Sequence, residues 1–148
     1  MTRMMIRYFD IANTAEHLLK DYRDQEWSLT YCKQQIKRLE AKAKRITSDL
    51  SKGHSKVYGN EAHFTDTVAE IDVYKQKYAD AVDYFNGFNP AWERMTEDER
   101  SLLTARYIDK YMDSGSMKRI MQEMHLSKTQ AYKLADDALN KFARYLFW

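Results

Sequence analysis

Between Asn13 and Leu50 apolar side chains recur every seven residues, and no glycine or proline interrupts the run. The repeat forms two columns that stand three residues apart. The first column is Ala15, Tyr22, Leu29, Ile36, Ala43 and Leu50, and the second is Leu18, Gln25, Cys32, Leu39 and Ile46. Two such columns form the seam of a coiled coil. The pattern predicts one helix of about 55 Å that starts with Asn13 as its cap and needs a partner helix.

A second periodic segment follows a short break. The stretch Ser51–Asn60 mixes glycine with polar side chains, which is the composition of a loop. Over Glu61–Asn86 one apolar column is Phe64, Ile71, Tyr78 and Phe85, and the other is Val68 and Val82. A short loop between two seams predicts an antiparallel helical hairpin, which Gly87–Pro90 should end. The first helix is the longer one, so its start is expected either to dimerise or to pack on the C-terminal module.

A capping signal begins the C-terminal segment, 91–148. Thr96 and Glu99 stand three residues apart with two acids between them, which is the pattern of a capping box at a helix start. The helix is predicted to run to about Met112 and to be followed by a turn over Asp113–Ser116. Its inward positions are Leu102, Leu103, Tyr107 and Ile108.

Two further helices follow, and a tight turn separates them. Met117–Met124 is predicted to be a helix of two turns, and His125–Ser127 the turn. Ser127 and Gln130 then form a second capping box, which begins a helix that runs to about Leu146. This order is the pattern of a helix-turn-helix. One side of the last helix carries Ala131, Leu134, Ala135, Ala138, Leu139 and Phe142, and the other carries Thr129, Tyr132, Lys133, Asp136 and Asn140.

The composition favours helices alone. The 148 residues include four glycines and one proline, which are too few for the turns of a strand protein. We therefore expect an all-α fold: a long, antiparallel, coiled-coil-like hairpin over 1–88 for oligomerisation or partner binding, then a helix-turn-helix bundle over 89–148. The formal net charge is only +2, so a nucleic-acid surface must come from local clustering. Such a cluster lies between residues 116 and 135, where four bases stand against one acid.

Several classes of function are disfavoured. Cys32 is the only cysteine, which fits a reducing compartment, and the expected location is the cytoplasm. No run of about 18 apolar residues predicts a membrane span, and Met1–Ile11 lacks the apolar core of a signal peptide. The histidines and the cysteine lack the spacing of metal ligands, and no phosphate loop or nucleophile elbow occurs. We therefore expect no metal, no cofactor and no enzyme activity.

The C-terminal segment resembles a known family. The motifs that carry the resemblance are Leu102-Leu103-Thr104-Ala105-Arg106-Tyr107, Ile120-Met121-Gln122-Glu123-Met124, Leu126-Ser127 and Ala138-Leu139-Asn140-Lys141-Phe142. Through them, residues 95–146 resemble the fourth conserved region of bacterial sigma factors. With its helical N-terminal part, the chain resembles phage late-gene transcription activators of the ArpU and RinA type. The resemblance implies a transcription regulator in a bacterial host cell, with double-stranded DNA and RNA polymerase as partners.

The expected DNA contacts lie at the starts of the two helices of the helix-turn-helix. Helix N-termini hold phosphates, and the first turns of the second helix enter the major groove. The candidate DNA-binding residues are Ser116, Lys118, Arg119, Ser127, Lys128, Thr129, Gln130, Tyr132 and Lys133. His125 stands where the family usually has glycine, so the turn is expected to be strained or differently wound. Asp136 and Asp137 would repel phosphate, so either only the first two turns enter the groove or Asp136 binds a cytosine amine.

Two other functions stay open at this stage. One is a coiled-coil adaptor whose C-terminal bundle binds protein, which the acid pair favours. The other is a phage DNA-packaging recognition subunit, which also combines a helix-turn-helix with helical oligomerisation. The basic run Lys33–Lys56 is either a solvated helix face or a second nucleic-acid contact. Trp27 lies off the seam, which favours a second contact surface on the first helix. A homo-oligomer through the N-terminal helices is expected.

Overall fold

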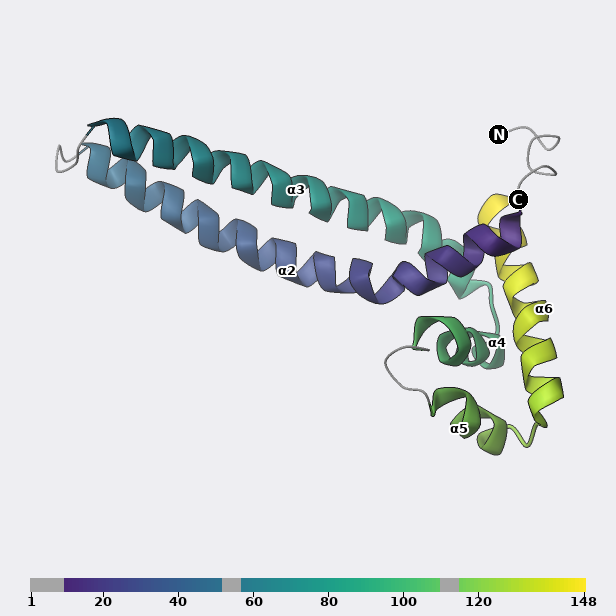
Figure 1. Ribbon diagram of the computed structural model, residues 1–148. Helices are drawn as coiled ribbons and strands as arrows, with labels where there is room; N and C mark the ends of the chain where they lie inside the picture. Colours follow the sequence, from purple (N-terminus) through teal and green to yellow (C-terminus); the bar gives the residue numbers. More distant parts are fainter. Residues whose placement is uncertain (1–9, 52–56, 110–114) are drawn as a thin grey trace. The chain divides into compact units, whose positions relative to one another are not determined.

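The computed structural model describes residues 10–51, 57–109 and 115–148, and within these ranges all regular structure is helical. The elements are α2 (Ile11–Ser51), α3 (Val57–Glu93), α4 (Glu97–Leu103), the π-helix η1 (Thr104–Ile108), α5 (Ser116–Glu123) and α6 (Lys128–Phe147) (Figure 1). The predicted all-α fold is confirmed for the described chain. No helix in these ranges combines the length and the apolar character that a bilayer span requires.

The chain forms two compact units. One consists of residues 24–84, the central part of the hairpin, and the other of the chain up to Arg23 together with Phe85–Trp148. The start of α2 therefore packs with the C-terminal helices, which is one of the two roles expected for it. The expected boundary between residues 88 and 89 falls inside α3.

The start of α2 lies earlier than the sequence predicted. Asp10, and not Asn13, accepts the capping bond: its Oδ1 receives the N–H of Asn13 at 3.1 Å. The carbonyl of Asp10 also accepts the N–H of Thr14 at 3.1 Å. Aspartate and asparagine are equally good caps, so residue preference alone could not choose between these two positions.

α3 begins earlier and ends later than predicted. It starts at Val57, inside the expected loop, and runs through Pro90 to Glu93. A proline inside a helix costs about 3 kcal/mol because it lacks an amide hydrogen and crowds the preceding turn. Phe88 is only 2% exposed and Ala91 is buried as well. Burying a phenylalanine side chain contributes about 2–3 kcal/mol, which offsets most of the cost of Pro90.

The seam of the hairpin unit follows the predicted columns on α2. Within residues 24–84, α2 and α3 lie side by side and antiparallel (Figure 1). Cys32, Leu39 and Ile46 are buried. The other column is half-buried at Leu29, Ile36 and Ala43, while Leu50 lies outside the described side chains. Both predicted columns of α2 are thus confirmed in this unit.

On α3 one predicted column is confirmed and the other is wrong. Ile71 is buried, but Val68 is 38% exposed and Val82 is only half-buried. The side chains that form the second column are instead Thr67, Tyr74 and Ala81. Sequence reasoning passed over Thr67 because threonine is polar. Its hydroxyl donates to the carbonyl of His63 at 2.8 Å, so the polar atom is satisfied within the helix and the methyl group can pack.

The helix after Thr96 widens into a π turn. Thr96 Oγ1 accepts the N–H of Glu99 at 3.2 Å, and Glu99 Oε1 accepts the N–H of Thr96 at 3.0 Å, which confirms the capping box. The N–H of Asp109 donates to the carbonyl of Thr104, five residues earlier, at 2.8 Å. In such a turn, residues five positions apart lie on the same face of the helix, so Leu102 and Tyr107 can both face inward. The predicted inward positions are all buried: Leu102, Leu103, Tyr107 and Ile108. The predicted helix end at Met112 lies outside the described residues.

Replacing Leu39 by aspartate should destabilise the hairpin, whereas the same change at Val68 should have little effect. Leu39 is fully buried in the seam, so Leu39→Asp should lower the free energy of unfolding by about 3–5 kcal/mol. Val68 is exposed, and Val68→Asp should cost less than about 1 kcal/mol. Thermal unfolding followed by circular dichroism measures both changes. Equal losses in the two variants would contradict the register described above.

Candidate nucleic-acid interface

The turn between α5 and α6 is a Schellman motif. The N–H of Leu126 donates to the carbonyl of Met121 at 2.9 Å, and that of His125 donates to Gln122 at 3.4 Å. These are the two hydrogen bonds that define the motif. His125 has a φ of 53°, in the left-handed region that glycine adopts without cost. The strain expected at His125 is therefore present, and the turn keeps a regular helix-ending geometry.

A capping box fixes the start of α6. Ser127 Oγ accepts the N–H of Gln130 at 3.2 Å, and Gln130 Oε1 accepts the N–H of Ser127 at 3.0 Å. The predicted box is thus confirmed, and both side-chain oxygens are occupied. The N–H groups of Lys128 and Thr129 have no acceptor within the part of the chain that the structure describes. Two amides at the positive end of a helix dipole are a suitable donor pair for a phosphate.

α6 has a buried side and an exposed side. The buried residues that face the other helices are Ala131, Ala135, Ala138, Leu139, Phe142 and Ala143. Leu134 was expected among them but is 42% exposed. It stands at the edge of the buried stripe and borders an open groove of about 360 Å³, which α4 and α6 both line. On the exposed side, Lys128, Thr129 and Lys133 are accessible and Tyr132 is half-buried.

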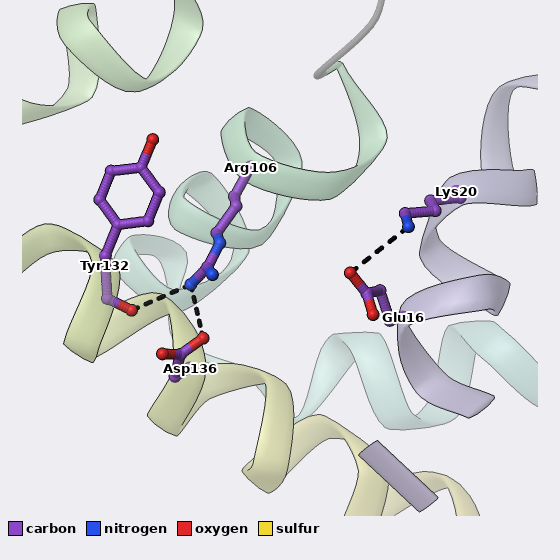
Figure 2. A network of polar contacts seen from close by, with 5 residues as sticks. All are labelled: Glu16, Lys20, Arg106, Tyr132 and Asp136. Atoms are coloured by element: carbon purple, nitrogen blue, oxygen red, sulfur yellow. Dashed lines mark hydrogen bonds and ion pairs between the residues drawn. The ribbon is translucent and has the colours of Figure 1, made fainter. Parts of the chain in front are cut away.

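Arg106 of η1 binds α6 at its second and third turns, as Figure 2 shows. Its Nη1 donates to the carbonyl of Tyr132 at 3.0 Å and forms an ion pair with Asp136. The guanidinium carbon also lies 4.8 Å from the centre of the Tyr132 ring. The negative charge of Asp136 is therefore partly compensated by Arg106. The carboxylate keeps a second oxygen, so a contact from Asp136 to a cytosine amine stays a prediction.

Further contacts hold α6 in place from its C-terminal half. Lys141 Nζ lies 3.2 Å from Glu99 Oε1 on α4. Burial raises the pKa of Glu99, but the hydrogen bonds from Thr96 and Lys141 outweigh it and hold the pKa below its usual value. The stabilisation from this carboxylate is therefore present at neutral pH and is lost as the pH falls through the lowered pKa. The next residue, Phe142, packs against α3: its ring centroid lies 5.2 Å from that of Phe88 and 5.6 Å from that of Trp92.

The predicted site residues fall into three groups. Lys128, Thr129, Tyr132 and Lys133 come together on the outward side of the first two turns of α6, while Ser127 and Gln130 form the cap. Lys118 and Arg119 are exposed on α5. Ser116 is buried, so its hydroxyl is not an exposed contact. Sequence reasoning missed the role of Arg106, because Arg106 meets Asp136 thirty positions later and no local pattern marks such a pair.

No protein-family model, curated protein or solved structure matches this chain. The likeness to the fourth conserved region of sigma factors therefore rests on the motifs quoted above. Among the described residues, no group of three or more histidine, cysteine, aspartate or glutamate side chains is placed to hold a metal ion.

Replacing His125 by glycine should stabilise the C-terminal helices. Glycine adopts a φ of 53° without the steric cost that a Cβ incurs, although it also raises the entropy of the unfolded chain. The expected gain in the free energy of unfolding is about 0.5–1 kcal/mol. Urea unfolding measures it, and His125→Ala, which keeps the Cβ, is the matched control. A glycine variant no more stable than the alanine variant would refute strain at this turn.

Proposed function

We propose that this chain is a DNA-binding transcription regulator of the phage late-gene activator type. It acts in the cytoplasm of a bacterial host cell and is not an enzyme. The observation that carries the proposal is the start of α6, where a capped helix with unbonded amides at Lys128 and Thr129 follows a tight turn. The exposed cation Lys133 lies on the outward side of the next turn.

The first two turns of α6, about 10 Å of helix, enter the major groove. The amides of Lys128 and Thr129 hold a phosphate, and the side chains of Gln130, Tyr132 and Lys133 approach base edges or the backbone. Gln130 retains two amide donors beyond its capping bond. Asp136 is paired with Arg106, which reduces the repulsion of phosphate at the third turn.

The cations of α5 extend the contact along the DNA backbone. Lys118 and Arg119 are exposed and belong to the helix that braces α6. Together with Lys128 and Lys133 they supply four positive charges, which suits phosphate neutralisation by a chain whose net charge is only +2. The N-terminal helices provide self-association, and RNA polymerase is the protein partner that an activator needs.

A protein-binding adaptor without DNA binding is the second candidate function. The groove beside Leu134 favours it, because Leu102, Met124 and Ala138 give the groove an apolar floor. The charged residues that also line it are of both signs, which would suit a partner segment that carries both: Asp98, Glu99, Asp137, Lys141 and Arg144. DNA binding separates the two candidates directly.

Lys133→Ala should weaken DNA binding. A phosphate or base contact from this position is worth about 1–3 kcal/mol, so the dissociation constant should rise by about five- to a hundredfold. Arg144→Ala is the matched control, since Arg144 is also exposed on α6 but lies about 16 Å further along the helix. Gel-shift titration on DNA selected by genome-wide capture gives both constants. Equal affinities for the two variants, each folded by circular dichroism, would reject the assigned groove-binding face.

Salt dependence should separate the α5–α6 cations from the basic run on α2. Four neutralised phosphates give a slope of log affinity against log salt of about 3 to 4 per subunit. Replacing Lys37, Lys44 and Arg45 by glutamine should leave this slope unchanged, because the proposal assigns DNA contact to the C-terminal helices. A slope that falls by two or more units would show that the basic run on α2 also contacts DNA. A slope near zero in the unchanged chain would reject DNA binding and favour the adaptor.

A further inference from the structure

An exposed group of aromatic rings lies on one flank of the hairpin unit 24–84. Trp27 is 60% exposed, yet its ring stacks on Tyr31 with centroids 4.2 Å apart and an angle of 15°. Tyr31 meets the edge of Tyr74 on α3 at 5.9 Å. The side-chain hydrogen bond between these two tyrosines is the largest cause of the raised pKa of Tyr74. The three rings are therefore held in fixed positions while the largest of them faces solvent, which is typical of a contact surface.

Acidic and basic side chains are placed symmetrically about these rings. On α2, Asp24 stands seven residues before Tyr31 and Arg38 seven residues after it. Both share the face of Tyr31, since seven residues are close to two helical turns. Neither makes an ion pair within residues 10–51, 57–109 and 115–148.

α3 repeats the arrangement at the level of Tyr74. Glu70 precedes Tyr74 by four residues, and Lys77 follows it by three. Glu70 and Arg38 both act on the hydroxyl of Tyr74 electrostatically, and Lys77 Nζ lies 5.7 Å from its ring. Because α2 and α3 are antiparallel, Arg38 and Glu70 lie at one end of the flank, and Asp24 and Lys77 at the other. Each end thus carries one acid and one base, with the signs exchanged between the helices.

We propose that this flank is a dimer interface for a second copy of the chain. The two-fold axis runs from Tyr31 to Tyr74, in the plane of the interface and perpendicular to the helices. It places α2 opposite α2 of the second copy and α3 opposite α3 of the second copy. In each of these pairs the two helices run in opposite directions. Asp24 then faces Arg38 of the partner subunit, and Glu70 faces Lys77 of the partner subunit. The aromatic rings meet at the centre, enclosed by four ion pairs. An isologous interface uses the same patch on both subunits, so the patch must be complementary to itself. The charges of this flank meet that condition, which favours a second copy of the chain as the partner.

The inference deepens the self-association assigned to the N-terminal helices in the proposed function and is independent of DNA binding. It is tested by sedimentation equilibrium of the full chain without DNA, over a series of concentrations. The unchanged chain should dimerise. D24R and R38D each replace two symmetry-related attractions by repulsions, so each should raise the dimer dissociation constant about tenfold. The double variant D24R/R38D should restore it to within about threefold, because the pairs re-form with opposite signs.

E40R is the matched control. Glu40 is exposed on α2 but stands nine residues from Tyr31, on the opposite side of the helix, so its reversal should leave the dissociation constant unchanged. Trp27→Ala should weaken the dimer as strongly as D24R. Its melting temperature, measured at a concentration where both chains are monomeric, should equal that of the unchanged chain, because the exposed ring contributes little to the single chain. A monomer at every concentration, or a dimer that no flank variant weakens, overturns the inference. So does a double variant as weak as the single ones. A dimer that binds no DNA upholds the inference and rejects only the proposed function.

Discussion

The burial of Phe88 against Phe142 is the interaction on which the C-terminal unit depends. These rings, with Trp92, join the end of α3 to the C-terminal half of α6. Trp92 lies after Pro90 and reaches Phe142 because α3 continues as a helix through the proline, so this packing offsets the cost of the strongest helix breaker in the sequence. It also anchors α6 at the end remote from Lys128. One end of α6 is therefore held by packing, while its first two turns keep an outward side with few contacts.

Electrostatics at the exposed end of α6 are governed by a residue from another element. Without Arg106, the outward side would present Asp136 and Asp137 directly after Lys133, and its net effect on a phosphate would be repulsive at the third turn. The guanidinium supplies a positive charge there and spaces η1 from α6 at the same time. A buried or half-buried arginine that bonds a carbonyl and a carboxylate has little freedom to move, so this local balance of charge is built into the packing.

Local chemistry was predictable from the sequence and long-range geometry was not. Both capping boxes, the strained His125 and the seam of α2 follow from residue types at fixed short spacings, and the structure contains all of them. The second column of α3 was mispredicted because Thr67 is polar and was therefore expected to be exposed. Its hydroxyl donates to the carbonyl of His63 in the same helix, which allows the side chain to be buried. The pairs Arg106–Asp136 and Arg23–Asp109 depend on how separate helices pack, which no short window of sequence contains. The π turn of η1 was not predicted, because Leu103 and Tyr107 also stand four residues apart, as in a regular α-helix.

The π turn of η1 restricts how the length of this helix can vary. Removing one residue between Leu103 and Asp109 would restore α-helical hydrogen bonding and keep the helix intact. Later side chains would keep their directions, because the residue five positions after Thr104 already takes the place that the fourth would take in an α-helix. The carboxylate of Asp109, now 3.0 Å from Arg23, would therefore stay within reach of it. The same deletion within Glu97–Leu103, where the helix is regular, would instead turn Asp109 by about 100° around the axis and away from Arg23. The helix can thus lose one residue at η1 but not within α4 without losing this ion pair.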